Sequence, residues 1–191
     1  MKPVTRSELL DLGAYEQIRE PFRARILALK KSRYVALGPN MTALFENHDT
    51  VLFQIQEMLR TERITAEKAI LHELETYNEL VPGDRELSAT IFIEYPDPSE
   101  RERQLRALVG VEDKFFVEVG GERFSNVPDR RGSDDAQTMA VHYVKFPLSE
   151  AAVTALVAGS APLELGVDHP AYRAVAELAP ATLASLRDDF G

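Results

Sequence analysis

The sequence predicts an α+β fold, in which a mixed or mainly antiparallel sheet packs against a helical hairpin and terminal helices. Two observations carry this prediction. In the first half of the chain, apolar residues recur every three or four positions, which is typical of amphipathic helices. In the second half, they alternate with polar residues between turn signals, which is typical of strands. No linker or repeat divides the 191 residues, so we expect a single α+β domain over residues 1–191.

The helices of the first half follow from the spacing of apolar side chains. The first stripe consists of Tyr15, Ile18, Phe22, Ile26 and Leu29. Pro21 interrupts this stripe, so we expect either a kink there or a new helix with Pro21 in its first turn. Residues 51–59 and 70–81 each present one apolar face, and the short connection between them predicts an antiparallel helical hairpin. Asp49 or Thr50 can cap the first helix of that hairpin.

The strands are marked by alternation and by turn residues. Residues 33–37 and 42–46 flank Gly38-Pro39-Asn40, and residues 114–119 and 122–125 flank Gly120-Gly121, so both pairs predict β-hairpins. Further strands are expected over residues 87–95, 138–146, 163–169 and 172–178. The run 138–146 is apolar on both faces, which favours a central position in the sheet. The polar run 126–137 is expected to be an exposed loop.

Composition and charge exclude several classes of protein. With 22 basic and 31 acidic residues the net charge is −9, which disfavours nucleic acid as a partner. The absence of cysteine excludes disulfides and cysteine-ligated iron–sulfur clusters. No apolar run is long enough for a membrane span, and the first residues lack a signal core, so we expect a cytoplasmic protein without membrane contact. Residues 1–35 hold eight basic and four acidic residues, and their charge either pairs with the acidic remainder or binds a partner.

One set of polar residues raises the hypothesis of a metal site. His142 lies in the apolar run 138–146, His169 precedes Pro170, and Glu94 lies on the mixed face of another expected strand. Two histidines and a carboxylate suit zinc or non-haem iron. The alternative is that both histidines and the carboxylate are simply hydrogen-bonded within the fold. No ligand-spacing motif chooses between the two, and the sequence leaves open whether any cofactor is present.

A second set of residues points to a binding surface on the helix around residues 51–63. Phe53, Glu57 and Arg60 lie opposite its apolar face. A phenylalanine there indicates that this side is covered too, by the sheet, another helix or a second chain, in which case Glu57 requires a polar partner such as Arg60. The alternative is a surface ion pair beside an incidental exposed phenylalanine.

Four runs of sequence resemble a bacterial domain family of unknown function. They are LFENHDTVLFQIQEMLRTERI at 44–64, ELETYNELVPGDRELSATIFIE at 73–94, VHYVKF at 141–146 and LGVDHPAY at 165–172. The resemblance implies a genomic neighbourhood with rubrerythrin and an iron–sulfur oxidoreductase. It therefore implies a role in oxygen or peroxide defence or in an associated electron-transfer system, with one of these redox proteins as the partner. Because the chain has no cysteine to ligate a cluster, that role would be an accessory one.

Two functions follow as hypotheses from different classes. The first is an accessory protein that docks a redox partner, through the basic segment 1–35 or through the surface around Phe53. The second is a small metalloenzyme that uses His142, His169 and Glu94. The phosphate-binding, dinucleotide-binding, serine hydrolase and zinc protease motifs are absent from the sequence. Whether the protein is an enzyme, and its oligomeric state, are left open by the sequence.

Overall fold

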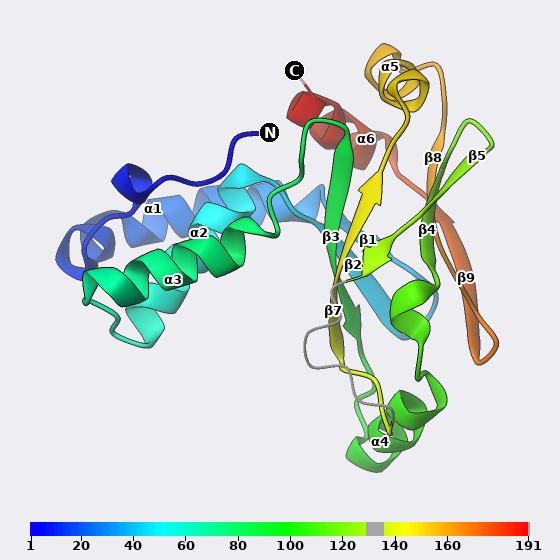
Figure 1. The fold of residues 1–191 in the computed structure, drawn as a ribbon, viewed down its shortest axis with the longest axis horizontal. Helices are drawn as coiled ribbons and strands as arrows, with labels where there is room; N and C mark the ends of the chain where they lie inside the picture. Colours follow the sequence, from blue (N-terminus) through cyan, green and yellow to red (C-terminus); the bar gives the residue numbers. More distant parts are fainter. Residues whose placement is uncertain (129–135, 191) are drawn as a thin grey trace.

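The computed structural model describes residues 1–128 and 136–190. Its strands form two antiparallel sheets, which confirms the α+β class (Figure 1). Sheet A has the order β1 (Tyr34–Ala36), β2 (Met41–Phe45), β3 (Glu86–Ile93), β7 (Val141–Pro147) and β6 (Val127–Pro128). Sheet B has the order β5 (Glu122–Ser125), β4 (Phe115–Val119), β8 (Leu163–His169) and β9 (Tyr172–Glu177).

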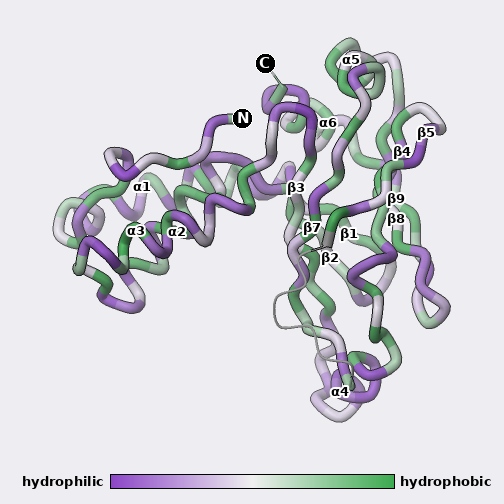
Figure 2. Tube along the Cα trace, in the orientation of Figure 1, coloured by the Kyte–Doolittle hydropathy of each residue, from purple (hydrophilic) through white to green (hydrophobic). Residues whose placement is uncertain are grey.

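The main core lies between the two sheets. Alternating residues of each strand point inward, and Phe45 of β2, Ile91 of β3, Val117 of β4 and Leu165 of β8 are all fully buried there. Three helices close the two ends of this sandwich: α4 (Pro98–Ala107) at one end, and α5 (Glu150–Ala158) and α6 (Pro180–Arg187) at the other (Figure 1). In Figure 2 hydrophobic stretches run along the strands of both sheets, whereas α4 is mostly hydrophilic.

The other three helices form an arm on the outer side of sheet A (Figure 1). We call this unit the helical arm; it consists of α1 (Leu12–Lys31), α2 (His48–Thr61) and α3 (Glu67–Asn78). A second hydrophobic cluster holds it together, with Val51, Ile55 and Leu59 of α2 packed on Ile70 and Leu74 of α3. Tyr143 of β7 packs against the same cluster and so connects the arm to sheet A.

Local sequence explains where these helices begin and continue. Asn47 caps α2, with its side chain accepting a hydrogen bond from the Thr50 amide, so the cap lies before the predicted Asp49 or Thr50. α1 continues through Pro21, which removes one donor from the helix without ending it. Short 3-10 turns complete the fold at Arg6–Glu8 (η1), Val111–Asp113 (η2) and Asp188–Phe190 (η3).

Two expectations concern the polar loop and the membrane. Residues 129–135 of the predicted loop 126–137 lie outside the described part of the chain. Across the described residues, none of the helices combines the length and the apolar character that a bilayer crossing requires.

Candidate functional site

The predicted binding residues Phe53, Glu57 and Arg60 lie against α1. The Tyr15 hydroxyl donates to Glu57 Oε1 at 2.7 Å, and Arg19 donates to both carboxylate oxygens of Glu57 at 2.8 Å. These donors hold the pKa of Glu57 below its ordinary value, with the hydrogen bonds from Arg19 as the largest cause. The partner of Glu57 is therefore Arg19, because Arg60 pairs with Glu16 of α1 instead.

Phe53 is enclosed by the same helix. Its side chain is 9% exposed, and its ring lies 5.9 Å from the ring of Phe22 and 5.5 Å from the ammonium group of Lys30. The sequence left open whether the sheet, another helix or a second chain covers the Phe53 side of α2. In the structure this cover is α1, a helix of the same chain. The Phe53 side of α2 is thus an internal contact of the helical arm rather than a free surface.

The basic segment 1–35 is partly neutralised within the chain. Ion pairs join Arg6 to Glu67, Arg19 to Glu57, Arg25 to Asp49 and Arg33 to Asp189. Four of the eight basic residues in this segment thus form ion pairs with acidic residues elsewhere in the fold. The covered Phe53 and these ion pairs thus tie both expected docking regions into the fold itself.

The three predicted metal ligands do not meet. His142 points between the two sheets, where it is 4% exposed and its Nε2 lies 3.1 Å from the Thr138 hydroxyl. Glu94 follows Ile93, an inward residue of β3, so its carboxylate lies on the other side of sheet A, where it accepts a hydrogen bond from Thr42 at 2.7 Å. Strand alternation therefore places sheet A between the two side chains.

His169 is held by the backbone at the end of β8. Its Nε2 lies 3.1 Å from the Val109 carbonyl, and its Nδ1 accepts a hydrogen bond from the Ala171 amide. Within residues 1–128 and 136–190, no group of three or more histidine, aspartate and glutamate side chains is placed to hold a metal ion. Each of the three residues thus has partners of its own.

His142 belongs instead to a buried polar chain that the sequence did not indicate. Thr138 lies between His142 and Glu112, with its hydroxyl 3.4 Å from Glu112 Oε2. Burial lowers the pKa of His142, and the negative charge of Glu112 opposes that shift. Thr138 and His142 are four residues apart, but Glu112 lies 26 positions before Thr138, so no local pattern could have linked it to them.

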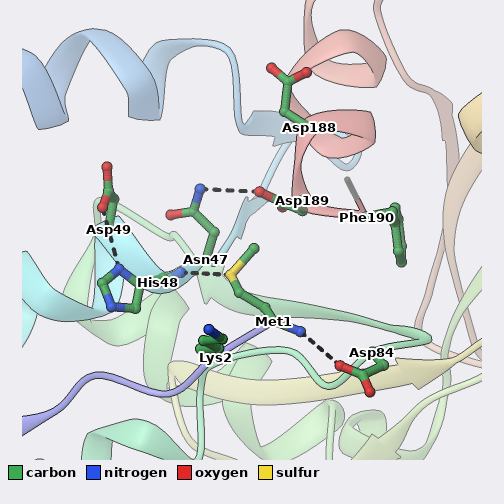
Figure 3. A pocket seen from close by; sticks show the side chains of 9 residues that line it. All are labelled: Met1, Lys2, Asn47, His48, Asp49, Asp84, Asp188, Asp189 and Phe190. Atoms are coloured by element: carbon green, nitrogen blue, oxygen red, sulfur yellow. Dashed lines mark hydrogen bonds and ion pairs between the residues drawn. The ribbon is translucent and has the colours of Figure 1, made fainter.

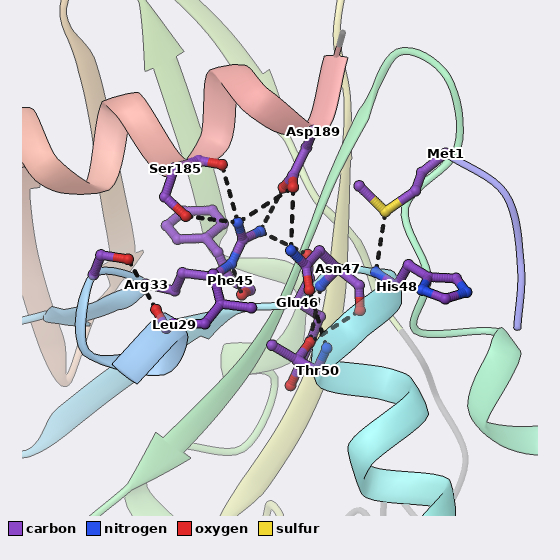
Figure 4. A network of polar contacts seen from close by, with 11 residues as sticks. Met1, Leu29, Arg33, Phe45, Glu46, Asn47, His48, Thr50, Ser185 and Asp189 are labelled. Atoms are coloured by element: carbon purple, nitrogen blue, oxygen red, sulfur yellow. Dashed lines mark hydrogen bonds and ion pairs between the residues drawn. The ribbon is translucent and has the colours of Figure 1, made fainter. Parts of the chain in front are cut away.

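A second polar network joins the helical arm, sheet A and the C-terminal turn (Figure 4). The Arg33 guanidinium is fully buried and donates to the backbone carbonyls of Phe45 and Glu46 at 2.7 and 3.0 Å. It also forms an ion pair with Asp189 of η3, which accepts a further hydrogen bond from the Asn47 amide group. Burial raises the pKa of Asp189, and the contacts with Arg33 oppose that shift. This network fixes the β2–α2 junction.

A pocket of about 700 Å³ opens beside this junction (Figure 3). Its lining includes Asp49, Asp84, Asp188 and Asp189. Three of these carboxylates already have cationic partners. Asp49 pairs with Arg25, Asp84 with the N-terminal ammonium group and Asp189 with Arg33. The pocket therefore offers little uncompensated charge for a cation, despite its acidic lining.

The outer face of sheet B is the broad surface that the described helices leave uncovered (Figure 1). At its centre the ring of Phe116 lies across Gly166, where a Cβ atom would come within 2.1 Å of the ring, and the Arg123 guanidinium lies 3.7 Å from the ring centroid. Gly166 is paired with Val175 of β9, whose side chain is 58% exposed. The middle of this face thus combines the exposed Val175 with a Phe116 ring that is buried beneath Arg123.

A row of three glutamates crosses the same face. Glu118 of β4 is directly opposite Glu164 of β8, which is directly opposite Glu177 of β9. Among the residues that the structure describes, Glu118 alone in this row has a cationic ion-pair partner, Arg123 at 3.4 Å. Like charges directly opposite one another destabilise a sheet. The fold thus retains an arrangement that costs stability.

The fold is an α+β architecture in which two antiparallel sheets enclose the main core and a helical arm lies on sheet A. The chain belongs to the family described as "Protein of unknown function (DUF3501)", whose model matches residues 3–190. This confirms the resemblance to a family of unknown function. A crystal structure of a protein of unknown function from Burkholderia pseudomallei K96243 is 39% identical, with a TM-score of 0.92 and all of both chains covered. No curated protein matches the chain.

Proposed function

We propose that the protein is a cytoplasmic accessory protein that docks a redox partner through the outer face of sheet B. The row of Glu118, Glu164 and Glu177 carries this proposal. A partner that brings lysine or arginine side chains to this row would relieve the repulsion between the three carboxylates. The free energy that the repulsion costs in the free protein would then be recovered as binding free energy in the complex.

The composition of the face supports a charged rim around an apolar centre. Asp168 and Arg173 form an exposed ion pair at one side of the centre, at 2.8 Å. The exposed Val175 provides apolar surface between this pair and the glutamate row, beside the Arg123 guanidinium that covers the buried Phe116 ring. Such a surface suits a transient complex, in which charge directs the approach and a small apolar patch stabilises contact.

The identity of the partner rests on the resemblance to the family. It suggests a rubrerythrin or an iron–sulfur oxidoreductase, and hence a role in oxygen or peroxide defence. Because this chain has no cysteine, any iron–sulfur cluster held by cysteine would belong to the partner. The acidic row further requires that the partner's docking surface be basic.

The test is a binding measurement with each candidate partner, using calorimetry at low and at high salt. The double variant Glu164→Gln and Glu177→Gln should weaken binding about tenfold at low salt, with a smaller effect at high salt because exposed charges are then screened. The same variant should be slightly more stable than the wild-type protein, because the repulsion is removed. Reduced binding in a more stable protein cannot come from unfolding.

The matched control is the double variant Glu62→Gln and Glu75→Gln, which removes two exposed charges, one just after α2 and one on α3. It should leave binding unchanged. Equal weakening by both double variants would mean that only net charge matters, and would overturn the docking face. Failure of the wild-type protein to bind either redox protein would overturn the proposed partner class.

A further inference from the structure

A small cavity lies where the helical arm meets the outer side of sheet A. Its volume is about 220 Å³, below the roughly 300–1,000 Å³ of pockets for drug-sized ligands, so it suits a compact molecule. Its polar lining comes from α1, β1, α2 and the strands beneath, and consists of Lys30, Tyr34, Glu46, Gln54, Thr90 and Tyr143. It is separate from the docking face, which lies on the outer side of the other sheet (Figure 1).

Glu46 is the unusual residue of this cavity. The residue is 8% exposed, and its carboxylate accepts hydrogen bonds from the hydroxyls of Thr50 and Thr90. Across the described chain no lysine, arginine or histidine forms an ion pair with this carboxylate. The neighbouring guanidinium of Arg33 donates to the Glu46 backbone carbonyl and pairs with Asp189 instead (Figure 4).

A buried carboxylate without a cationic partner is costly, because hydroxyl donors replace only part of its hydration. Each of its oxygens has a second lone pair, and each accepts one threonine hydroxyl here. The site can therefore accept further hydrogen bonds from a cationic donor. The partner that best compensates this group is a ligand with a positive charge.

The remaining walls favour the same kind of ligand. Leu44, Val51 and Phe92 provide apolar surface, and Tyr34 and Tyr143 add aromatic rings. Aromatic rings attract cations as well as apolar groups. Burial and the negative charges of Glu46 and Glu94 raise the pKa of Tyr34, so the field of the carboxylate reaches the tyrosine hydroxyl. Lys30 also lines the cavity, but its ammonium group lies over the ring of Phe53, at the contact between α1 and α2.

We propose that this cavity binds a small organic cation, with its ammonium group at Glu46 and a compact apolar body against Leu44 and Phe92. The geometry also distinguishes this ligand from two alternatives of similar size. A neutral ligand would leave the Glu46 charge uncompensated, and an anion would be repelled by it. An anion could bind more tightly than the cation only if it paired with Lys30.

Three probes of one shape test the proposal: benzylammonium, benzyl alcohol and benzoate, titrated into the ¹⁵N-labelled wild-type protein. Benzylammonium should shift the amide signals of Leu44, Thr90 and Phe92, and should bind at least about tenfold more tightly than the other two, a difference of about 1.4 kcal/mol. The variant Glu46→Gln should lose this preference for the cation. Glu94→Gln, which removes a neighbouring charge outside the cavity, should retain it.

The wild-type comparison keeps the proposal falsifiable even if Glu46→Gln fails to fold. Equal binding of benzylammonium and benzyl alcohol would overturn the role of the carboxylate. Tighter binding of benzoate would assign the cavity to Lys30 and an anion. Absence of shifts at Leu44, Thr90 and Phe92 with benzylammonium would overturn the cavity as a cation site.

Discussion

Arg33 and Asp189 form a buried ion pair between residues 156 positions apart in the sequence. Arg33 immediately precedes β1, and Asp189 lies in η3 at the end of the chain. Hydrogen bonds from the same guanidinium to Ser185 of α6 extend the contact. The ion pair therefore closes the fold by holding its C-terminal turn on the junction between the helical arm and sheet A.

Removal of Asp189 should strongly destabilise the protein. In Asp189→Ala the fully buried Arg33 loses its ionic partner, which costs about 3–5 kcal/mol in comparable buried pairs. Urea unfolding measures this change. Asp168→Asn, which breaks an exposed pair with Arg173, is the control and should change stability by less than about 1 kcal/mol. Similar losses for the two variants would show that the buried pair has no special role.

Glu57 should make the stability of the helical arm depend on pH. The pKa of Glu57 is lower in the folded protein than in the unfolded chain, so its contribution is present above the unfolded value and is lost as the pH falls through the folded value. Glu57→Gln should cost roughly 1 kcal/mol near neutral pH, because hydrogen bonds to the charged group are lost. The difference from the wild type should close in acid.

Urea unfolding at neutral and acidic pH measures this effect. Glu20→Gln, at a side chain that is 82% exposed, provides the control and should change stability little at either pH. A Glu57→Gln difference that persisted in acid would contradict the role of charge at Glu57.

His142 should remain neutral at pH 7. Burial between the sheets disfavours its charged form, and Glu112 only partly offsets that effect. Ring resonances of His142 followed by NMR should therefore titrate below the value of about 6.5 found for unperturbed histidine. The assignment can be made with His142→Gln. A midpoint above the unperturbed value would mean that Glu112 outweighs burial.

Gly166 should be required for the position of the Phe116 ring. A Cβ atom at this position would overlap the ring, so Gly166→Ala should cost about 1–3 kcal/mol and displace Phe116 from the centre of sheet B. Gly13→Ala is a suitable control, because Gly13 lies in α1 with room for a methyl group and alanine favours helices. Unchanged stability of Gly166→Ala would contradict the observed packing.

Local sequence patterns predicted the individual helices and strands better than they predicted how the strands pair into sheets. The Gly120-Gly121 turn between β4 and β5 is confirmed, as are the helical segments of α2 and α3. Their signals come from neighbouring residues, which is why they can be recognised in the sequence. The division of the strands into two sheets depends on pairings between distant segments, and no local period encodes those pairings.

The contrast between local patterns and distant contacts also explains how far the site residues could be predicted. A polar partner for Glu57 could be expected from the apolar Phe53 beside it, but Arg19 could not be named because it lies on another helix. His142 and Glu94 shared suitable chemistry, yet the alternation of side chains put them on opposite sides of sheet A. The glutamate row on sheet B became visible only through the strand register.

The most direct test of the proposed function is to map the contact surface on the ¹⁵N-labelled protein. Unlabelled rubrerythrin or iron–sulfur oxidoreductase would be added, and the perturbed amide signals would be followed by NMR. The docking account predicts that signals of Glu118, Glu164, Val175 and Glu177 shift or broaden, while those of Phe53 and Glu57 stay unchanged. Perturbation confined to the helical arm, with sheet B unaffected, would contradict it.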